Sequence, residues 1–504
     1  MAEWFLAKIN SFGNLDDVQQ REEILTELKI KFAKLSPEES SEIVRNLDLS
    51  KLFSQLTSND KEVVEQVCDA LNIILHGSEA GQVLWRYTSE IYGILSHKLP
   101  YVKEFALQEI LRVASDPNSL PQLLLKLDLL TVVTETVADE NLGVAEHAIN
   151  VLKKIGQNEE GLKILYSGVL LRSIAKLLSL NDIVKFRVYD IIVDIAKNSK
   201  NGLAVSVNSG FLQSLISNLN DDDILIQLNA LETLTELAST KVGLDFLEQN
   251  QVLQQLAEKI ARAHETPLSN LLIPGLMKFF GNVAQLCPDE IFSRYPVVIS
   301  ALFEVIESED QTILAIALDT LGHVSSSVKG KYALQKLGNA MPSALKKMSE
   351  IIKKMPSELR VRGLNNLTHI LSISKPEQDN RILSLIKSWF DSLGDEPLKL
   401  IVSLSKQPFA DIRQASLEVL HVIASQEWGQ EYIANYPGLV EFLLDRSVES
   451  FKKCKELKFE IVESLAESVP DIFDAQTMQR FNKFINEGPF YINTITDIAV
   501  DGVS

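Results

Sequence analysis

Apolar residues recur along most of this chain at the i, i+3 and i+4 spacing that places them on one face of an α-helix. Within this helical pattern, a small residue is followed by apolar residues one and four positions later, and the combination returns every forty-odd residues. Eight of the ten small positions hold Ala, Gly or Ser. The ten positions are Ala70, Ala106, Ala148, Val188, Ala230, Gly275, Ala317, Gly363, Ser416 and Ile461.

The period of this pattern predicts the fold. Nine intervals cover 391 residues, or about 43 residues each, within the roughly 40 to 47 residues of armadillo and HEAT repeats. We therefore predict an all-α protein, an armadillo/HEAT-type α-solenoid (α-α superhelix) of about ten repeats with a helical N-terminal cap. A small residue at the marked position would let helices of neighbouring repeats cross closely. A leucine at Ala230 should then cost roughly 1 to 3 kcal/mol through overpacking.

Short polar breaks separate the predicted helices and carry helix-capping chemistry. Asp60, Asn181 and the run from Asp221 to Asp223 can accept hydrogen bonds from the first amides of the helix that follows. We interpret the three aspartates as caps rather than as a metal site. Residues 15–34 predict one helix, and Pro37 is at the first position of another. The predicted organisation is a helical cap over residues 1–57, a solenoid over residues 58–488 and a C-terminal tail over residues 489–504.

Composition and net charge limit the cellular compartments and the classes of partner that we expect. The chain has 504 residues, of which 46% are hydrophobic, and 49 Lys and Arg against 68 Asp and Glu give a net charge of −19. This charge repels phosphate backbones, so we expect no nucleic-acid partner. Three widely separated cysteines and no signal-peptide pattern favour the cytoplasm, or also the nucleus. The longest uncharged stretch, residues 201–220, is too polar for a membrane helix, and we expect no membrane partner.

No motif for catalysis is complete in this sequence. Lys329-Gly330-Lys331 suggests a phosphate-binding loop, but Ser325 occupies the upstream position that requires glycine. His323 and His369 occupy equivalent positions in adjacent repeats, where a shared metal or proton site is an alternative to two solvent-facing or partner-facing side chains. We expect no enzymatic activity, no cofactor and no metal.

A solenoid binds partners through an extended concave face of equivalent helix positions. We predict that this face is the stripe at positions −1, +3 and +6 from the small residue, where polar residues of both signs suit the surface of a folded protein. A merely solvated face is the alternative. The stripe contains Glu109, Arg112, His147, Lys154, Arg187, Asp194, Asn229, Thr233, Glu236, Lys278, Thr320, His323, Arg362, Asn366 and His369.

Several strings resemble the proteasome non-ATPase regulatory subunit five family. They are spread in order over most of the chain, and they are NDIVKFRVY (181–189), IPGLMKFFGN (273–282), RYP (294–296), YPGLVE (436–441), DRSVE (445–449) and EGPFY (487–491). The resemblance implies an armadillo/HEAT-type solenoid that acts as an assembly chaperone of the proteasome regulatory particle. It further implies binding to the C-terminal domain of one or two base ATPase subunits, promotion of base assembly and a block on premature docking to the core particle. It implies neither enzymatic activity nor a cofactor.

Two other interpretations remain open from the residues alone. A general armadillo adaptor or transport protein that binds basic peptides would suit the acidic net charge, although we find no regular aromatic and amide ladder in the stripe. An enzyme whose site forms only on folding is the third class. We expect the chain by itself to be monomeric.

Overall fold

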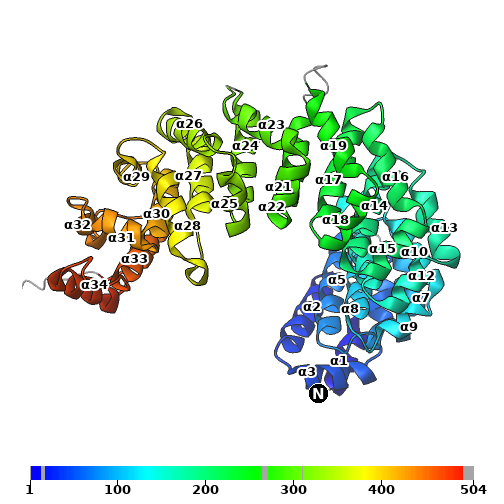
Figure 1. Cartoon of the computed structure of the whole chain (residues 1–504). Coiled ribbons are helices and arrows are strands. Elements are labelled where there is room, and N and C mark those ends of the chain that lie inside the picture. The colour runs from blue at the N-terminus through cyan, green and yellow to red at the C-terminus, as the bar shows by residue number, and fades with distance from the viewer. Residues whose placement is uncertain (1, 13–17, 59, 264–270, 309, 492–504) are drawn as a thin grey trace, which may run out of the picture. The chain divides into compact units, whose positions relative to one another are not determined.

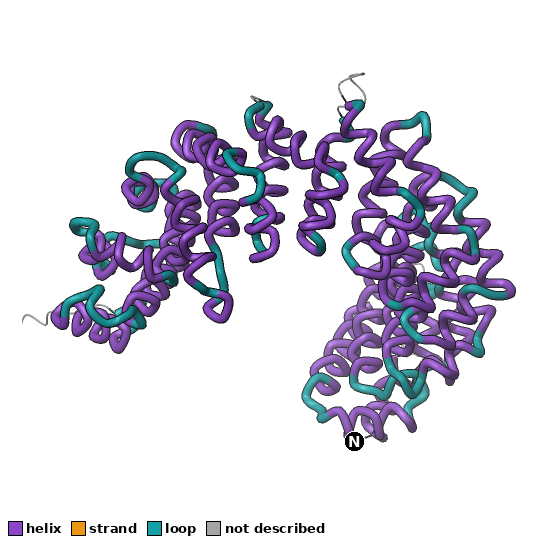
Figure 2. Tube along the Cα trace, viewed as in Figure 1, coloured by secondary structure: helices purple, strands orange, loops and turns teal. Residues whose placement is uncertain are grey.

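The structure is a computed structural model that describes residues 2–12, 18–58, 60–263, 271–308 and 310–491. Every regular element in this described part is a helix (Figures 1 and 2). The chain forms two compact units, Met1–Phe246 and Leu247–Ser504, and the boundary between them falls within α18 (Lys241–Gln249). The predicted all-α class is thus confirmed, and each unit is described below by itself.

The first unit consists of helices that are mostly short, interrupted by longer ones. The longer helices recur as every third element from α5 onward, which is the order expected of armadillo-type repeats. The helices are α1 (Ala2–Phe12), α2 (Val18–Phe32), α3 (Pro37–Asn46), α4 (Ser50–Gln55), α5 (Lys61–His76), α6 (Gln82–Arg86), α7 (Thr88–Ile94), α8 (Pro100–Ser115), α9 (Leu120–Leu124), α10 (Leu127–Thr136), α11 (Leu142–Gly156), α12 (Glu159–Leu165), α13 (Gly168–Leu177), α14 (Asp182–Asn198), α15 (Lys200–Asn208), α16 (Phe211–Ser217) and α17 (Ile224–Ala238).

The second unit continues the same three-helix order. Its helices are α19 (Val252–Ala261), α21 (Ile273–Leu286), α22 (Pro288–Arg294), α23 (Pro296–Ile306), α24 (Gln311–Val324), α25 (Val328–Gln335), α26 (Ala340–Lys354), α27 (Ser357–Leu371), α28 (Asn380–Asp391), α29 (Pro397–Leu404), α30 (Ala410–Ala424), α31 (Glu427–Ala434), α32 (Leu439–Leu444), α33 (Lys452–Ala466) and α34 (Ala475–Glu487). Short 3₁₀ turns at Asn218–Asn220 and Lys375–Glu377 complete the regular structure of the described residues.

The last helix of each three-helix repeat, called the third helix below, carries the small position predicted from the sequence. In the first unit α5, α8, α11, α14 and α17 pack successively side by side, and in the second unit α21, α24, α27, α30 and α33 do the same. Of the ten small positions on these helices, nine are buried, and only Gly275 is partly exposed. The predicted solenoid of about ten repeats is confirmed for the described residues.

At Gly363 the close packing is within one repeat rather than between neighbouring repeats. A Cβ added at Gly363 would lie 2.8 Å from Ile352 of α26, in the same repeat. Close approach between neighbouring third helices instead occurs at Gly281, which faces Thr320, and at Gly322, which faces Asn366. The small position at Gly363 therefore serves packing within one repeat, which corrects the expected contact between repeats at that residue.

A second repeated glycine, not predicted from the sequence, follows five of the ten third helices where the next repeat begins. A Cβ at this position would lie 1.9 to 2.2 Å from a carbonyl oxygen in the last turn of the preceding third helix, so only glycine fits. In four of the five cases the N–H of the glycine also donates to the capping side chain three residues earlier. The glycines are Gly161, Gly202, Gly243, Gly330 and Gly429.

The caps predicted from the sequence form hydrogen bonds at several helix starts. Asp60, Asn181 and Asp223 accept from the first-turn amides of α5, α14 and α17. Ser36 caps α3 in a capping box with Glu39, and Pro37 is at its first position, as predicted. These residues fix where the helices begin, so the capping interpretation of Asp223 is confirmed.

The N-terminal segment is helical, and its second helix continues the packing of the first unit. The predicted helix over residues 15–34 is observed as α2, which packs against α5. The next two helices, α3 and α4, precede α5 in the same order as the first two helices of later repeats. Most of the predicted tail, residues 492–504, lies outside the described residues.

Candidate binding face of the third helices

The third helices expose a row of polar side chains two positions after the small residue. Nine of the ten residues at this position are Asn, Gln, Asp or Glu, and seven of the ten are exposed. We call the nine residues the polar row. They are Asn72, Gln108, Asn150, Asp190 and Glu232 in the first unit, and Asp319, Asn365, Glu418 and Glu463 in the second. The tenth position holds the buried Met277.

The polar row was visible in the sequence but was not part of the predicted stripe. Position +3, which the prediction used, lies about 100° further around the helix than position +2. Six of the ten residues at position +3 are buried, because this position faces the neighbouring third helix. The predicted stripe therefore includes one column of which most residues are buried between the third helices.

The residues of the predicted stripe divide into three groups by exposure. Asn229, Glu236, Lys278 and His369 are exposed. The half-buried group consists of Arg112, His147, Lys154, Arg187, Asp194, Thr233, His323 and Arg362. Glu109, Thr320 and Asn366 are buried, and we leave these three out of the candidate face because a partner cannot reach their side chains.

Glu109 and Arg112 join two repeats inside the first unit. Arg112 Nε donates to Glu109 Oε2 at 2.8 Å, and its Nη1 donates to the carbonyl oxygen of Ser78 at 2.8 Å. Burial raises the pKa of Glu109, while the hydrogen bond and the charge of Arg112 lower it. The pair thus connects α8 to the turn after α5, and its role is structural.

Arg187 also has a structural role. Its Nη1 donates to the carbonyl oxygens of Val137 and Asp139, both at 2.9 Å, and so joins α14 to the chain that follows α10. Reversing this charge would leave two carbonyl groups without their donor. A charge reversal at Arg187 together with Asp194, which the sequence suggested as a test of partner binding, would therefore also disturb folding.

A polar bridge connects α24 and α27 in the second unit. Asn366 donates from Nδ2 to Asp319 Oδ1 at 2.7 Å, and Arg362 Nε lies 3.4 Å from Asp319 Oδ2. Thr320 donates to the carbonyl oxygen of Ile316, one turn back in its own helix. The bridge holds Asp319 of the polar row in one position, which reduces the entropy that binding through it would cost.

In the first unit, side chains of adjacent third helices also pair along the face. Gln108 and His147 lie 3.2 Å apart, Lys153 pairs with Asp190 at 2.8 Å, and Lys197 donates to Glu236 at 3.5 Å. Lys154, from the predicted stripe, contacts Gln157 of its own helix end at 3.4 Å. Asp194 lies 3.7 Å from Lys197. Such half-exposed pairs contribute little stability each, and they can exchange for contacts with a partner.

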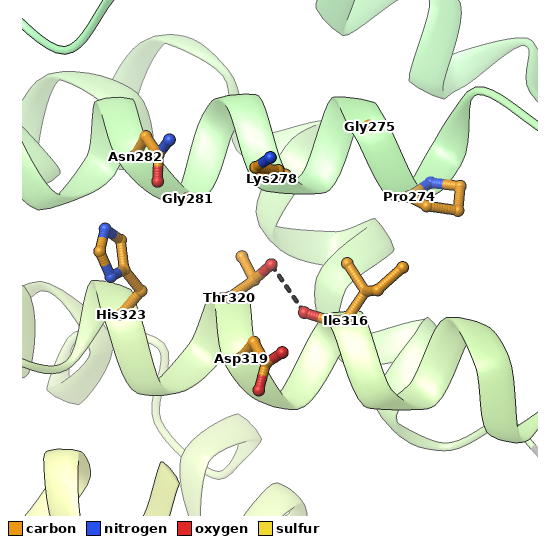
Figure 3. A pocket seen from close by; sticks show the side chains of 9 residues that line it. All are labelled: Pro274, Gly275, Lys278, Gly281, Asn282, Ile316, Asp319, Thr320 and His323. Atoms are coloured by element: carbon orange, nitrogen blue, oxygen red, sulfur yellow. Dashed lines mark hydrogen bonds between the residues drawn. The ribbon is translucent and has the colours of Figure 1, made fainter. Parts of the chain in front are cut away.

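A hollow of about 390 Å³ opens between α21 and α24 in the second unit. Figure 3 shows Lys278 and Asn282 on α21 opposite Thr320 and His323 on α24, with Pro274 and Ile316 toward the other end. Burial lowers the pKa of His323, and His369 on α27 lowers it further, so the imidazole is neutral at neutral pH. The mostly apolar walls and polar rim can accept an apolar side chain of a partner.

The described residues contain no cluster of metal-binding side chains, and two of their thiols are buried. No group of three or more His, Cys, Asp or Glu could hold a metal ion there, which includes the surroundings of His323 and His369. Burial raises the pKa of Cys68 to about 12 and that of Cys454 to about 11, so neither thiol is a nucleophile near neutral pH. A search of the same residues finds no helix that combines the length and the apolar character needed to span a membrane.

The repeats, their packed third helices and the exposed polar row define an armadillo/HEAT-type α-solenoid. Sequence comparison then identifies the family. The chain belongs to the proteasome non-ATPase 26S subunit family, whose model matches residues 1–503. This confirms the resemblance found in the sequence and supports a proteasome-associated role.

Individual relatives agree with this assignment over most of their length. The 26S proteasome non-ATPase regulatory subunit 5 of Homo sapiens is 34% identical over 459 residues, which cover 90% of this chain and 91% of the human protein. The Bos taurus protein of the same name is 34% identical over 494 residues, or 97% and 98% of the two chains. Among solved structures, Kap121p aligns with a TM-score of 0.47 and 13% identity, over 96% of this chain and 51% of Kap121p.

Proposed function

We propose that this chain is a non-catalytic assembly chaperone of the proteasome regulatory particle. It binds the C-terminal domain of one or two ATPase subunits of the base, promotes base assembly and prevents premature docking on the core particle. The observation that carries the proposal is the family match over residues 1–503, together with relatives that are 34% identical and named as non-ATPase regulatory subunits.

The surface of the third helices supports this role. The polar row presents carboxylates and amides at the same position of successive helices, and adjacent repeats are joined by half-buried hydrogen bonds such as those of Arg112 and Arg187. A rigid surface of this kind binds a folded domain without a large cost in ordering. The net charge of −19 favours a partner surface with basic groups, and it disfavours nucleic acid.

Two buried thiols and the residues of the hollow support the proposed non-catalytic role. The thiols of Cys68 and Cys454 are buried and protonated, and the hollow beside His323 lacks a paired base and nucleophile. We therefore propose binding without catalysis and without a cofactor. We place the protein in the cytoplasm, or also in the nucleus, where assembling proteasomes would be its partners, and expect it to be monomeric before it binds.

The decisive experiment is calorimetric titration of the purified full chain into each isolated C-terminal domain of the base ATPases at moderate salt. One-to-one binding to one or two of these domains would support the proposal and identify the client. No binding to any of them, with the chain shown to be folded by circular dichroism, would contradict it.

One observation favours a second candidate function, a general adaptor for extended basic peptides. Within each unit the polar row places amides and carboxylates at one position of successive third helices, where they could hold a peptide backbone and its lysines, although the row contains no aromatic residue. Such binding should weaken steeply with salt, since exposed charges are screened beyond about 10 Å at 0.1 M. Titration with a basic localisation peptide at two salt concentrations separates this function from the chaperone.

A further inference from the structure

Three large aliphatic side chains are exposed at the start of three neighbouring third helices in the first unit. Leu142 on α11 is 68% exposed, Ile183 on α14 is 70% exposed and Leu225 on α17 is 64% exposed. Each is the first or second residue of its helix, and α14 packs against both α11 and α17. Singly exposed apolar residues need no explanation, but these three all lie in the first turns of third helices that pack side by side. We call these three residues the apolar edge.

The apolar edge contributes little to folding, because most of each side chain remains in water. The core below it is formed by other residues of the same first turns, such as Val144 and Val184, which are buried. Polar side chains at the three edge positions would be equally compatible with these helices. Exposure of three aliphatic groups therefore costs solubility without an evident gain in stability, which is typical of a binding surface.

The backbone that carries the edge is fixed before any partner binds. Asn141 Oδ1 accepts from Val144 N at 3.1 Å, Asn181 Oδ1 accepts from Val184 N at 2.9 Å, and Asp223 Oδ1 accepts from Leu225 N at 2.8 Å. All three helices thus begin with a capped first turn. A surface that is already ordered loses little entropy on binding.

Charge around the edge indicates the kind of partner. Six carboxylates lie just before the three helices or at their first residue, and Lys103 and Lys185 pair with two of them, Asp139 and Asp182, at 2.5 and 2.6 Å. The other four leave the edge with net negative charge; they are Glu140, Asp221, Asp222 and Asp223. Further along the same helices are Asn150, Asp190 and Glu232 of the polar row. The complementary surface is apolar and is flanked by lysine or arginine.

We propose that the apolar edge is a docking surface for one partner, a folded domain that presents an apolar patch flanked by basic side chains. The inference rests on the proposed function, since the domain meant is the ATPase C-terminal domain that the chain binds. It adds the place of contact on the first unit and the chemistry that the client must present.

The test compares two triple variants of the full chain. The first replaces the edge, with Leu142→Ser, Ile183→Ser and Leu225→Ser. The matched control replaces three other exposed aliphatic residues of the first unit, one just after α9 and two at the starts of α10 and α13, with Leu125→Ser, Leu127→Ser and Val169→Ser. Both variants are titrated by calorimetry with each ATPase C-terminal domain, and circular dichroism melts check that both are folded.

We expect the edge variant to bind about tenfold more weakly than the wild type, as for the loss of a few central apolar contacts, and the control to bind as the wild type does. Wild-type affinity in a folded edge variant would overturn the inference while leaving the proposed function intact. If the wild type binds none of the domains, the proposed function fails and this inference fails with it. If sedimentation shows that the wild type dimerises and the edge variant does not, the edge is an interface between copies of this chain, and the inference is also overturned.

Discussion

Lys331 is a fully buried cation that connects two repeats of the second unit. Its Nζ donates to the carbonyl oxygens of Ser325 at 2.5 Å, Ile370 at 2.7 Å and His369 at 3.1 Å. These carbonyls belong to the ends of α24 and α27, where the helices leave them without backbone partners. Burial nevertheless lowers the pKa of Lys331 to about 7, although the charge of Glu377 opposes this.

The lowered pKa predicts a pH dependence of stability. Between a pKa of about 7 in the folded chain and 10.5 in the unfolded chain, the unfolded state binds more protons at this residue, so its contribution to the free energy of unfolding increases with pH. Lys331→Met removes this contribution and leaves three carbonyls unpaired, at a cost of about 1 to 3 kcal/mol near neutral pH. Urea unfolding of the wild type and of Lys331→Met from neutral to alkaline pH measures both the loss of stability and its pH dependence.

Lys329→Met is the matched control, because Lys329 is an exposed lysine on the same helix. We expect it to unfold as the wild type does at every pH. If the difference in free energy of unfolding between the wild type and Lys331→Met does not change with pH, Lys331 stays charged over this range. Its three carbonyl partners then outweigh the effect of burial on its pKa.

Gln251 is a non-glycine residue in the left-handed conformation, with φ of 59°. It precedes α19, and glycine with positive φ occupies the corresponding place before α16 and α32 in other repeats. We expect Gln251→Gly to raise the free energy of unfolding by about 0.5 to 1 kcal/mol, because it removes the steric cost of a Cβ there. Gln254→Gly, three residues later in the helix, should lower it by about 1 kcal/mol. Chemical denaturation measures the free energy of unfolding of both variants. An equal decrease in the two would contradict a steric cost of the Gln251 side chain.

At the scale of the helix, the packing of the third helices depends on the small position. Ala230 is completely buried on α17, whereas Asn229 beside it is exposed. Ala230→Leu should lower the free energy of unfolding by about 1 to 3 kcal/mol, because the extra atoms have no space. Asn229→Leu adds a similar side chain to the same helix and should change stability by less than about 0.5 kcal/mol. Circular dichroism melts measure both, and equal midpoints would mean that the small position is not a packing requirement.

The connection between repeats depends on a different residue. Gly243 at the start of α18 approaches the carbonyl oxygen of Leu237 so closely that a Cβ would lie 2.0 Å from it. The same glycine recurs thirteen or fourteen residues after the small position in five repeats. This glycine recurs as regularly as the small position. It is required by the turn between two repeats, and the spacing of apolar residues within helices does not predict that turn.

At the scale of the molecule, two compact units each carry part of the polar row. If the client docks on the first unit, Asn150→Lys with Glu232→Lys should weaken its binding about tenfold through charge repulsion. The matched pair in the second unit, Asn365→Lys with Glu463→Lys, makes the same change in net charge and should leave affinity within about twofold. Titration at low and moderate salt distinguishes local repulsion from the general effect of net charge, and equal losses in both pairs would contradict docking on the first unit.

The sequence by itself determined the repeat, the number of third helices, several of their caps and the family. These features depend on the spacing of apolar and small residues within single helices, or on strings of adjacent residues, and both are readable without knowing how helices pack. Ala148, Ala230 and Ala317 are all fully buried, as the period predicted.

Only the tertiary structure decided which polar residues a partner can reach. The predicted stripe contains polar residues of different accessibility: Glu236 is exposed, whereas Glu109 and Asn366 are buried and Arg187 is half-buried. The last three form hydrogen bonds to groups three to fifty residues away in the chain. Which side of a helix faces its neighbour depends on the rotation with which helices pack, and a rotation of one residue position turns a side chain by about 100°. The pattern of one helix does not contain that rotation, so the exposure of the polar row and of the apolar edge could be established only from the packed third helices.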